Sequence, residues 1–390
     1  MGAHEAPYVA EDLAQGMAKD LVAPLWPAMT DDEIRDVLSC YTRKIDTSVR
    51  PLVLWRSPRP MSTAALVDLA GTTLFLKRHH VSVRTSERLR VEHDLTNHLL
   101  DKGCPLPAVL RTLDGDSVVR GGDYIFEVQE QALGEDLYRD VPSWYPFAAR
   151  AHAVSAGRAL ANFHCASHGF PLPATPPGVL TNSTQLVTSL NPLDELERLL
   201  ESRPDLLHAI GTRAVRHDVD HYLRPSIERA APLLNACSPQ WGHGDWHASN
   251  LTWSSRESDA VVVAVIDLSL ANRTFVIHDL AIAIERSCVD WLDVAGLGHI
   301  VADLDVVDAL LDGYEELRPL DSHEWATLIA VLPVVHVEFA LSEVEYFDRV
   351  AHQPHNVDLA YDDFLLGHTR WFKSRFGEDL LNRLRRRAEL

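Results

Sequence analysis

The stretch HGDWHASN occupies residues 243–250, and the apolar run VVVAVID that follows it ends at Asp267. This segment places one carboxylate, Asp245, on a glycine-containing loop and an amide, Asn250, five residues later. A second carboxylate stands at the end of a predicted strand. Phosphoryl transfer from ATP uses such groups, because one carboxylate orients and deprotonates an acceptor hydroxyl while amide and carboxylate oxygens hold Mg²⁺ against the phosphates. The segment therefore predicts a phosphotransferase.

The pattern H-G-D-x-x-x-x-N followed by I-D resembles the catalytic loop of the aminoglycoside phosphotransferase/choline kinase family, which has a protein-kinase-like fold. The resemblance implies Asp245 as the catalytic base and Asn250 and Asp267 as ligands of Mg²⁺. It also implies that His243 supports the loop structurally.

The segment after Asp267 argues for a small acceptor rather than a protein substrate. The family's D-L-A landmark stands at residues 279–281, and the resemblance implies that Asp279 ties the catalytic loop. Protein kinases insert an activation segment ending in A-P-E after their metal-binding aspartate. Only eleven residues separate Asp267 from Asp279, and no A-P-E follows. This spacing favours a small-molecule kinase.

An upstream Lys–Glu pair completes the predicted ATP site. The chain has few lysines, and Lys77 lies in the apolar, strand-like run LFLKRH. Glu92 follows fifteen residues later, in a helix predicted over residues 86–103. Kinases hold the α- and β-phosphates with a strand lysine that pairs with a helix glutamate. A strand lysine alone is usually a solvent residue, but the resemblance assigns Lys77 and Glu92 to this ion pair.

Two further parts of the nucleotide site are predicted from their place in the chain. Residues 56–66 should cover the phosphates; they contain no glycine, unlike a glycine-rich loop, but Ser62 and Thr63 are small and polar. The segment from Gln129 to Ala132 resembles the family's hinge, where backbone groups bind adenine.

The hydrophobic pattern predicts an α+β, two-lobed protein-kinase-like fold. Short apolar runs at 52–55, 64–70 and 73–79 are typical of strands, whereas most of the chain beyond residue 145 has helical periodicity. Long helices are predicted over, among others, residues 193–210 and 322–348. We expect a helical N-terminal extension over residues 1–50, a nucleotide-binding N-lobe over 51–132 and a C-lobe over 133–390 that carries the catalytic loop, the metal site and the acceptor pocket.

The composition is that of an ordinary globular protein with a large acidic excess. Of 390 residues, 46% are hydrophobic and 24% charged, and the formal net charge is -20. Such a charge disfavours binding to nucleic acid or to an anionic membrane surface. Five scattered cysteines without a C-x-x-C pair indicate a reducing, cytoplasmic environment. ATP and Mg²⁺ are the predicted cofactors, and the sequence leaves the oligomeric state open.

The acceptor is predicted only by class. Asp290, Glu338 and Glu345 are candidate acidic residues of an acceptor pocket in the helical lobe. With aromatic neighbours they would suit a cationic, hydroxyl-bearing molecule, such as an aminoglycoside-like antibiotic or an amino alcohol. A sugar acceptor is also open, and a merely solvated acidic helix face is the simpler interpretation of these residues.

Two other functions are weighed against the kinase. His243, Asp245 and His247 form an H-x-D-x-H pattern that would suit a zinc-dependent hydrolase. That alternative leaves Lys77 and Asn250, among others, without a role. A non-catalytic pseudokinase or binding protein would keep the fold without the chemistry, yet every expected catalytic group is present.

Overall fold

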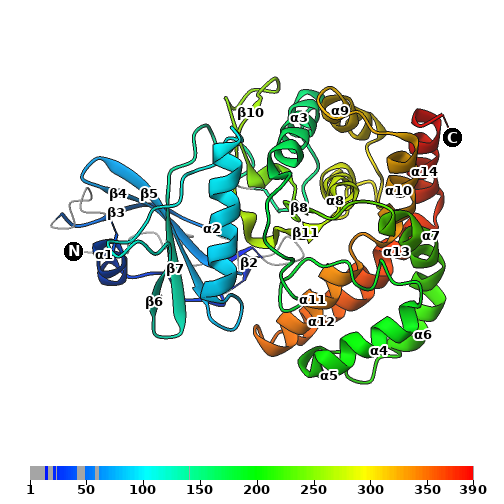
Figure 1. Cartoon of the computed structure of the whole chain (residues 1–390), viewed down its shortest axis with the longest axis horizontal. Helices are drawn as coiled ribbons and strands as arrows, with labels where there is room; N and C mark the ends of the chain where they lie inside the picture. Colours follow the sequence, from blue (N-terminus) through cyan, green and yellow to red (C-terminus); the bar gives the residue numbers. More distant parts are fainter. Residues whose placement is uncertain are drawn as a thin grey trace, which may run out of the picture. The chain divides into compact units, whose positions relative to one another are not determined.

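The computed structural model of the chain (Figure 1) divides into two compact units, Met1–His93 with Ala108–Gln131, and Asp94–Pro107 with Ala132–Leu390. The first unit is built on a β-sheet and the second is mostly helical, which confirms the predicted α+β class. The structure describes residues 14–15, 21–22, 24–41, 49–57, 61–139 and 141–389.

Five antiparallel strands form the sheet of the first unit, in the order β3–β4–β5–β7–β6. Their bounds are Leu52–Arg56 (β3), Thr63–Leu69 (β4), Thr72–His80 (β5), Val119–Gly121 (β6) and Tyr124–Glu130 (β7). The three strands predicted first lie within one residue of β3, β4 and β5. A tight turn joins β4 to β5 at Gly71, whose φ of +84° favours glycine.

One face of the sheet is apolar and carries helix α1 (Asp31–Ser39). Ile34 and Leu38 of the helix are fully buried in a core that includes Leu76 and Val128 of the sheet. The helix begins at a capping box in which Thr30 and Glu33 satisfy each other's backbone N–H groups. Burial of these apolar side chains supplies the main stabilisation of this layer.

The N-terminal segment differs from the predicted helical extension. Among the described residues before position 50, α1 is helical, while Ala14–Gln15 (β1) and Leu21–Val22 (β2) pair as short strands. For the rest of residues 1–50, the helical prediction falls partly outside the residues that the structure describes. Buried Arg78 connects α1 to the sheet, because its guanidinium donates to Glu33 at 2.9 Å.

The opposite face of the sheet is more polar and packs on α2 (Ser86–Asp101). Leu89 of the helix lies against Ile125 of β7 and against Val118, which directly precedes β6. The helix matches its predicted span closely. Because side chains alternate along a strand, β5 and β7 turn buried polar residues toward this face.

Close helix packing organises the second unit. Helices α3 (Arg150–Ser167) and α9 (Leu304–Glu315) approach so closely that glycines must stand at the contact. A Cβ on Gly157 would lie 1.9 Å from the carbonyl oxygen of Leu310, and the reciprocal contact holds for Gly313 of α9. These small residues allow the two backbones to touch.

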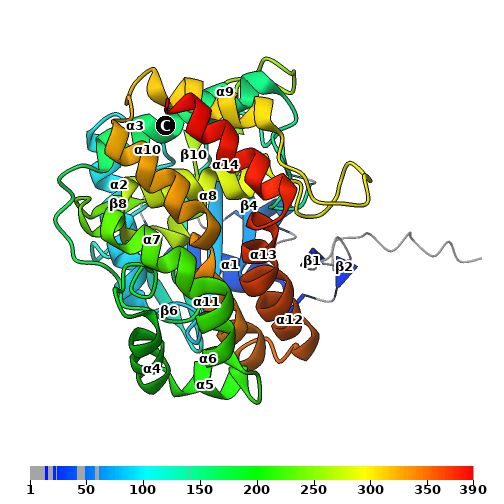
Figure 2. The same cartoon turned by 90° about the vertical axis from the view of Figure 1, so that its right-hand side faces the viewer.

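Most of the remaining helices of the second unit lie below α3 and α9 in the two views (Figures 1 and 2). The α-helices among them are Pro192–Ser202 (α4), Pro204–Ile210 (α5), Val215–Asp218 (α6), Arg224–Asn235 (α7), Val276–Cys288 (α8), Ser322–Val331 (α10), Val337–Arg349 (α11), Pro354–Asp358 (α12), His368–Phe372 (α13) and Arg375–Arg387 (α14). Figure 2 shows α14 beside α10.

Two predicted long helices are interrupted. The helix predicted over residues 193–210 breaks between α4 and α5, where Pro204 begins the second helix. The one predicted over 322–348 breaks at the short 3₁₀ turn Leu332–Val334, which contains Pro333. By length and composition alone Ser322–Arg349 resembles a membrane span, but 83% of its most apolar window is buried inside the protein, as in a core helix.

Candidate active site

Short strands carry the loop that contains Asp245. They are Gln240–Gly242 (β8), Leu251–Trp253 (β9), Val262–Val265 (β10) and Asn272–Thr274 (β11). β8 pairs with β11 and β9 pairs with β10, both antiparallel. The loop therefore leaves one strand pair and enters the other, so both of its ends are fixed.

Asp279 of α8 ties the start of this loop. Its carboxylate accepts hydrogen bonds from the backbone N–H groups of His243 and Gly244, both at 2.7 Å. His164 of α3 shares a third hydrogen bond with it at 2.9 Å. Burial would raise the pKa of Asp279, but the bond to His164 and the loop amides lower it below its usual value. The carboxylate is thus held ionised inside the protein.

Gly244 is required by the shape of the loop. Its φ is +77°, and a Cβ there would lie 2.1 Å from the carbonyl oxygen of Leu270. Only glycine fits this turn without displacing the backbone. The turn brings the next residue, Asp245, to the surface of the loop.

Asp245 is held by three side chains. Asn250 donates through Nδ2 to its carboxylate at 3.0 Å and to its carbonyl oxygen at 2.9 Å. Arg286 of α8 forms an ion pair with the other carboxylate oxygen. His247 lies 3.4 Å from the carboxylate. These contacts fix the carboxylate, while 15% of the Asp245 side chain stays exposed.

Arg286 is a residue of the site that the sequence analysis missed. Its guanidinium lies 4.7 Å from the ring centroid of Trp144 and 4.8 Å from that of Phe339. These rings favour the cation and restrict its rotamers. Arg286 follows Asp279 by seven residues, two helical turns, so both project from the same face of α8. That spacing is the signal that could have found it.

The charge of Arg286 decides the protonation of Asp245. Burial would raise the pKa of the carboxyl, but the charge of Arg286 and the contact with His247 lower it far below its usual value. Asp245 is therefore an ionised acceptor at all physiological pH values.

His243 connects the loop to the strand that precedes Asp267. Its Nε2 lies 3.1 Å from the carbonyl oxygen of Ile266, and its Nδ1 accepts from the backbone N–H of Asp245 at 3.2 Å. The neutral tautomer with the proton on Nε2 satisfies both contacts. The ring is fully buried, and its role as a support of the loop stays a prediction.

Asn250 and Asp267 lie on neighbouring backbone segments, because the carbonyl oxygen of Asn250 accepts from the N–H of Ile266 at 3.0 Å. The amide nitrogen of Asn250 is used by Asp245, so its side-chain oxygen is the atom left to bind a cation. Asp267 is exposed and left-handed, with φ +61°, and accepts from the N–H of Ser269 at 3.2 Å. Hard oxygen donors of this kind fit Mg²⁺.

Lys77 and Glu92 both lie in the first unit and both are buried. Lys77 stands in β5 directly opposite Glu127 of β7. The ion pairs described for Glu92 are with Arg84 and, at 3.6 Å, with Arg88. Burial raises the pKa of Glu92 despite these two cations. The predicted Lys77–Glu92 pair stays a prediction.

The predicted phosphate-covering loop is described in part, since residues 58–60 lie outside the described residues. Ser62 lies just before β4 and Thr63 begins it. The hydroxyl of Thr63 accepts from Arg78 at 3.3 Å.

The predicted hinge lies where the chain passes from the first unit to the second, between Gln131 and Ala132. The side chain of Gln129 donates to Glu127 at 2.8 Å, so it takes part in the sheet's polar network. Gly134, shortly after, has φ +89°. An adenine-binding role for this backbone remains a prediction.

Two of the predicted acceptor residues are engaged within the protein. Glu338 accepts from the hydroxyl of Ser183 and from backbone N–H groups, including that of Val187 at 3.1 Å. Glu345 pairs with Arg203, whose Nε lies 2.9 Å away. Both carboxylates are buried and occupied by these internal partners, so their observed contacts are structural.

The third predicted acceptor residue, Asp290, borders a surface pocket of the second unit. Its carboxylate oxygens accept from the N–H groups of Val294 and Ala295 at 2.6 and 2.8 Å.

Glu343 lies on the same helix as Glu338 but differs from the three predicted acceptor residues. It is 2% exposed, and its Oε2 has no hydrogen-bond partner.

The zinc-hydrolase alternative finds no support in the arrangement. Both ring nitrogens of His243 already contact protein atoms. Within the described ranges, the one group of His, Cys, Asp and Glu side chains close enough to share an ion is Glu285 with His336 and His368, outside the H-x-D-x-H pattern.

Comparisons with known proteins indicate the family of this chain. The profile of the phosphotransferase enzyme family matches residues 62–320. A homoserine kinase of Methylobacillus flagellatus is 23% identical over 282 residues, covering 71% of this chain and 75% of that protein.

Two solved structures share the fold. A microcompartment-associated aminopropanol kinase has a TM-score of 0.53 at 16% identity, covering 89% of this chain and 98% of its own. An aminoglycoside phosphotransferase from Alicyclobacillus acidocaldarius has a TM-score of 0.50 at 18% identity, covering 94% of this chain and 98% of its own. With the family profile matching more than half of its length, the chain belongs to the phosphotransferase enzyme family, whose members are small-molecule kinases with a protein-kinase-like fold.

Proposed function

We propose that the protein transfers the γ-phosphoryl group of ATP, with Mg²⁺, to a hydroxyl group of a small acceptor that also carries an amine. The observation that carries the reaction type is the setting of Asp245. Its carboxylate is ionised and is fixed by Asn250 and Arg286, and the Asp245 side chain is partly exposed. A carboxylate held in this way aligns an acceptor hydroxyl and accepts its proton as the bond to phosphorus forms.

The residues around Asp245 have separate roles in this proposal. Arg286 orients the carboxylate of Asp245. Asn250 donates a hydrogen bond to that carboxylate and is also one of the two proposed metal ligands. Asp267 is the other ligand. Mg²⁺ held there would neutralise charge on the phosphates of ATP. Lys77 binds the α- and β-phosphates, and Glu92 positions it.

The proposed amine contact is Glu343. Burial raises the pKa of Glu343 to about 8, and the nearby charge of Asp245 adds to that increase while Arg286 opposes it. A buried carboxylate with an unpartnered oxygen gains most from a cationic partner. An amine group of the acceptor would supply that partner near the catalytic carboxylate. The names of two relatives, a homoserine kinase and an aminopropanol kinase, also suggest acceptors with both an amine and a hydroxyl.

The role of Glu343 predicts a pH-dependent acceptor KM. The raised pKa means that Glu343 is mostly protonated at pH 7 and becomes an anion as the pH rises through about 8. The KM for an amino alcohol should therefore fall several-fold between pH 7 and 8.5 in the wild-type protein. In Glu343→Gln the KM should be higher and independent of pH, with the KM for ATP unchanged. Steady-state kinetics at five pH values measures this.

A matched acceptor without the amine is the control for this experiment. Its KM should be the same in wild type and Glu343→Gln at every pH. Equal amino-alcohol KM values in the two proteins would remove Glu343 from the acceptor site, while leaving phosphotransfer itself untouched. Thermal unfolding provides an independent check of the titration: relative to Glu343→Gln, the wild type should lose stability as pH rises from 5 to 8, because the folded form holds the proton more tightly.

A further inference from the structure

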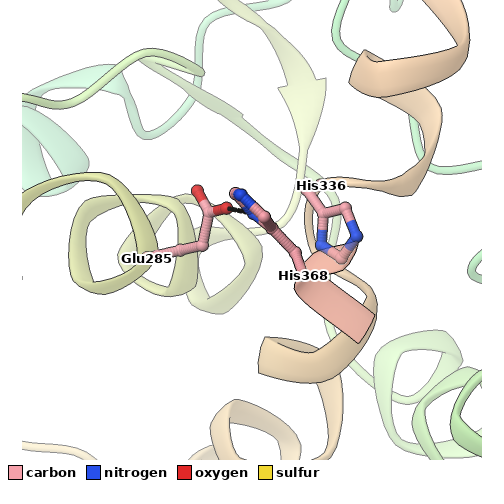
Figure 3. A group of neighbouring side chains, drawn as sticks. All are labelled: Glu285, His336 and His368. Carbon is pink, nitrogen blue, oxygen red and sulfur yellow. Dashed lines mark hydrogen bonds and ion pairs between the residues drawn. The ribbon is translucent and has the colours of Figure 1, made fainter. Parts of the chain in front are cut away.

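Three buried side chains from separate parts of the second unit lie close together at α8, the helix that contacts the catalytic loop through Asp279 and Arg286 (Figure 3). Glu285 lies in α8, His336 immediately precedes α11, and His368 begins α13. One potential ligand atom from each lies within 4.8 Å of the other two. Figure 3 shows the three side chains pointing toward one another.

Existing hydrogen bonds leave one of these groups unsatisfied. His368 Nδ1 and Glu285 Oε1 share a hydrogen bond at 2.6 Å. Nε2 of His336 lies 3.1 Å from the carbonyl oxygen of Leu365 and 3.3 Å from the hydroxyl of Thr369. Nδ1 of His336 is buried and has no partner. Burying a ring nitrogen without a hydrogen-bond partner costs folding free energy. A ligand bound to Nδ1 of His336 would remove that cost.

The contacts of His336 are those of a metal-binding histidine. Donation from Nε2 to a backbone carbonyl fixes the tautomer in which Nδ1 carries the lone pair. His368 is fixed as well, because Trp291 stacks on its ring with centroids 3.4 Å apart and planes 8° apart. Both imidazoles are thus oriented before any ion arrives.

We propose that Glu285, His336 and His368 form a binding site for a divalent transition-metal ion, Zn²⁺ foremost. Two imidazole nitrogens and one carboxylate are a typical Zn²⁺ donor set, whereas Mg²⁺ prefers oxygen donors. Bonds of about 2.1 Å would require the side chains to close slightly around the ion. The ion takes the place of the proton shared by Glu285 and His368, which is released, and it gives Nδ1 of His336 its missing partner.

This ion would act by positioning, not by catalysis. Glu285 directly precedes Arg286, the partner of Asp245. Trp144 lies against both Arg286 and His368, with 5.8 Å between its ring centroid and that of His368. An ion at this place would fasten α8 to α13 and to the start of α11. It would therefore keep the guanidinium that orients Asp245 in place.

The test is the metal content of the intact protein. The chain is produced in Zn²⁺-supplemented medium, freed of loosely bound metal by gel filtration, and measured by mass spectrometry of the elements. We expect one Zn²⁺ per wild-type chain, and a tetrahedral visible spectrum after Co²⁺ replacement. Glu285→Gln, which keeps the hydrogen bond to His368, and His336→Asn should each lower the affinity for Zn²⁺ by more than about tenfold and so reduce the retained Zn²⁺, because even the loss of a group that only supports a ligand costs about 10–100-fold in affinity.

A double variant controls for adventitious binding. His217 and His221 are exposed, stacked with ring centroids 5.8 Å apart, and spaced to chelate an ion on a helix surface. The variant His217→Ala/His221→Ala should keep its Zn²⁺. Chelation should lower the thermal midpoint of the wild type and of this control, but not that of Glu285→Gln.

The outcomes are decisive in both directions. Wild-type protein that is folded but holds no stoichiometric Zn²⁺ or Co²⁺ overturns the proposal, as does full Zn²⁺ retention in Glu285→Gln. If His336→Asn does not fold, the wild-type and Glu285→Gln measurements still decide. Because Glu343→Gln should keep the ion, the metal site and the proposed acceptor contact are tested separately.

Discussion

Replacement of Asp245 by asparagine should lower kcat by at least about 10²-fold, the scale of general base catalysis. The exchange keeps the size of the side chain, but its single oxygen can accept from only one of the two donors, Asn250 and Arg286, that flank Asp245. It removes the negative charge that aligns the acceptor hydroxyl and the site that accepts its proton. Binding of ATP should be unchanged, because Asp245 is assigned to the acceptor and not to the nucleotide.

Two measurements make this result interpretable. Asp363→Asn alters an exposed aspartate of the same unit and should have wild-type turnover. Nucleotide affinity and circular dichroism show whether Asp245→Asn is folded, since Arg286 loses its anionic partner. Turnover of the folded variant within threefold of the wild type would show that Asp245 is not the base.

Replacement of Asp267 by asparagine should abolish most Mg²⁺-dependent turnover, by about 10²-fold or more, as when one fixed electrostatic contact to a transition state is removed. Asparagine is the right exchange, because Asp267 has φ +61° and asparagine tolerates this region while alanine is strained there. The amide oxygen can also accept from the N–H of Ser269. The exchange therefore removes the charge that Asp267 offers to the metal.

The dependence on Mg²⁺ concentration identifies the cause. If Asp267 is a metal ligand, the variant should need a higher Mg²⁺ concentration for half-maximal rate, whereas Asp245→Asn should keep the wild-type requirement. A variant of Asp267 with lowered kcat and an unchanged Mg²⁺ requirement would contradict the assignment of Asp267 as a ligand.

The catalytic loop could be predicted because its chemistry is local in sequence. Asp245 and Asn250 lie on one loop, and Asp267 follows on the next strand. The loop's spacing therefore carries most of its geometry. The strands β3, β4 and β5 were predicted for the same reason, since their alternating apolar residues and the turn at Gly71 are short-range signals.

The supporting contacts could not be predicted, because they join distant parts of the chain. Arg286 meets Asp245 across 41 residues. Glu338 and Glu343 share a helix, and their sequence does not say which carboxylate is satisfied. Glu338 is satisfied by a segment about 150 residues away that includes Ser183, whereas Glu343 is left with an unpartnered oxygen. Only tertiary structure separates the structural glutamate from the candidate for binding.

The most direct test of the central claim is detection of the phosphorylated product. Wild-type protein is incubated with ATP, Mg²⁺ and a panel of small hydroxylated amines, including homoserine and aminopropanol, and the mixture is followed by ³¹P NMR. We predict that a new phosphate monoester resonance grows in step with ADP for at least one amino alcohol, and that it is absent with Asp245→Asn. Hydrolysis of ATP to free phosphate without any ester, or equal ester formation by wild type and Asp245→Asn, would contradict the account.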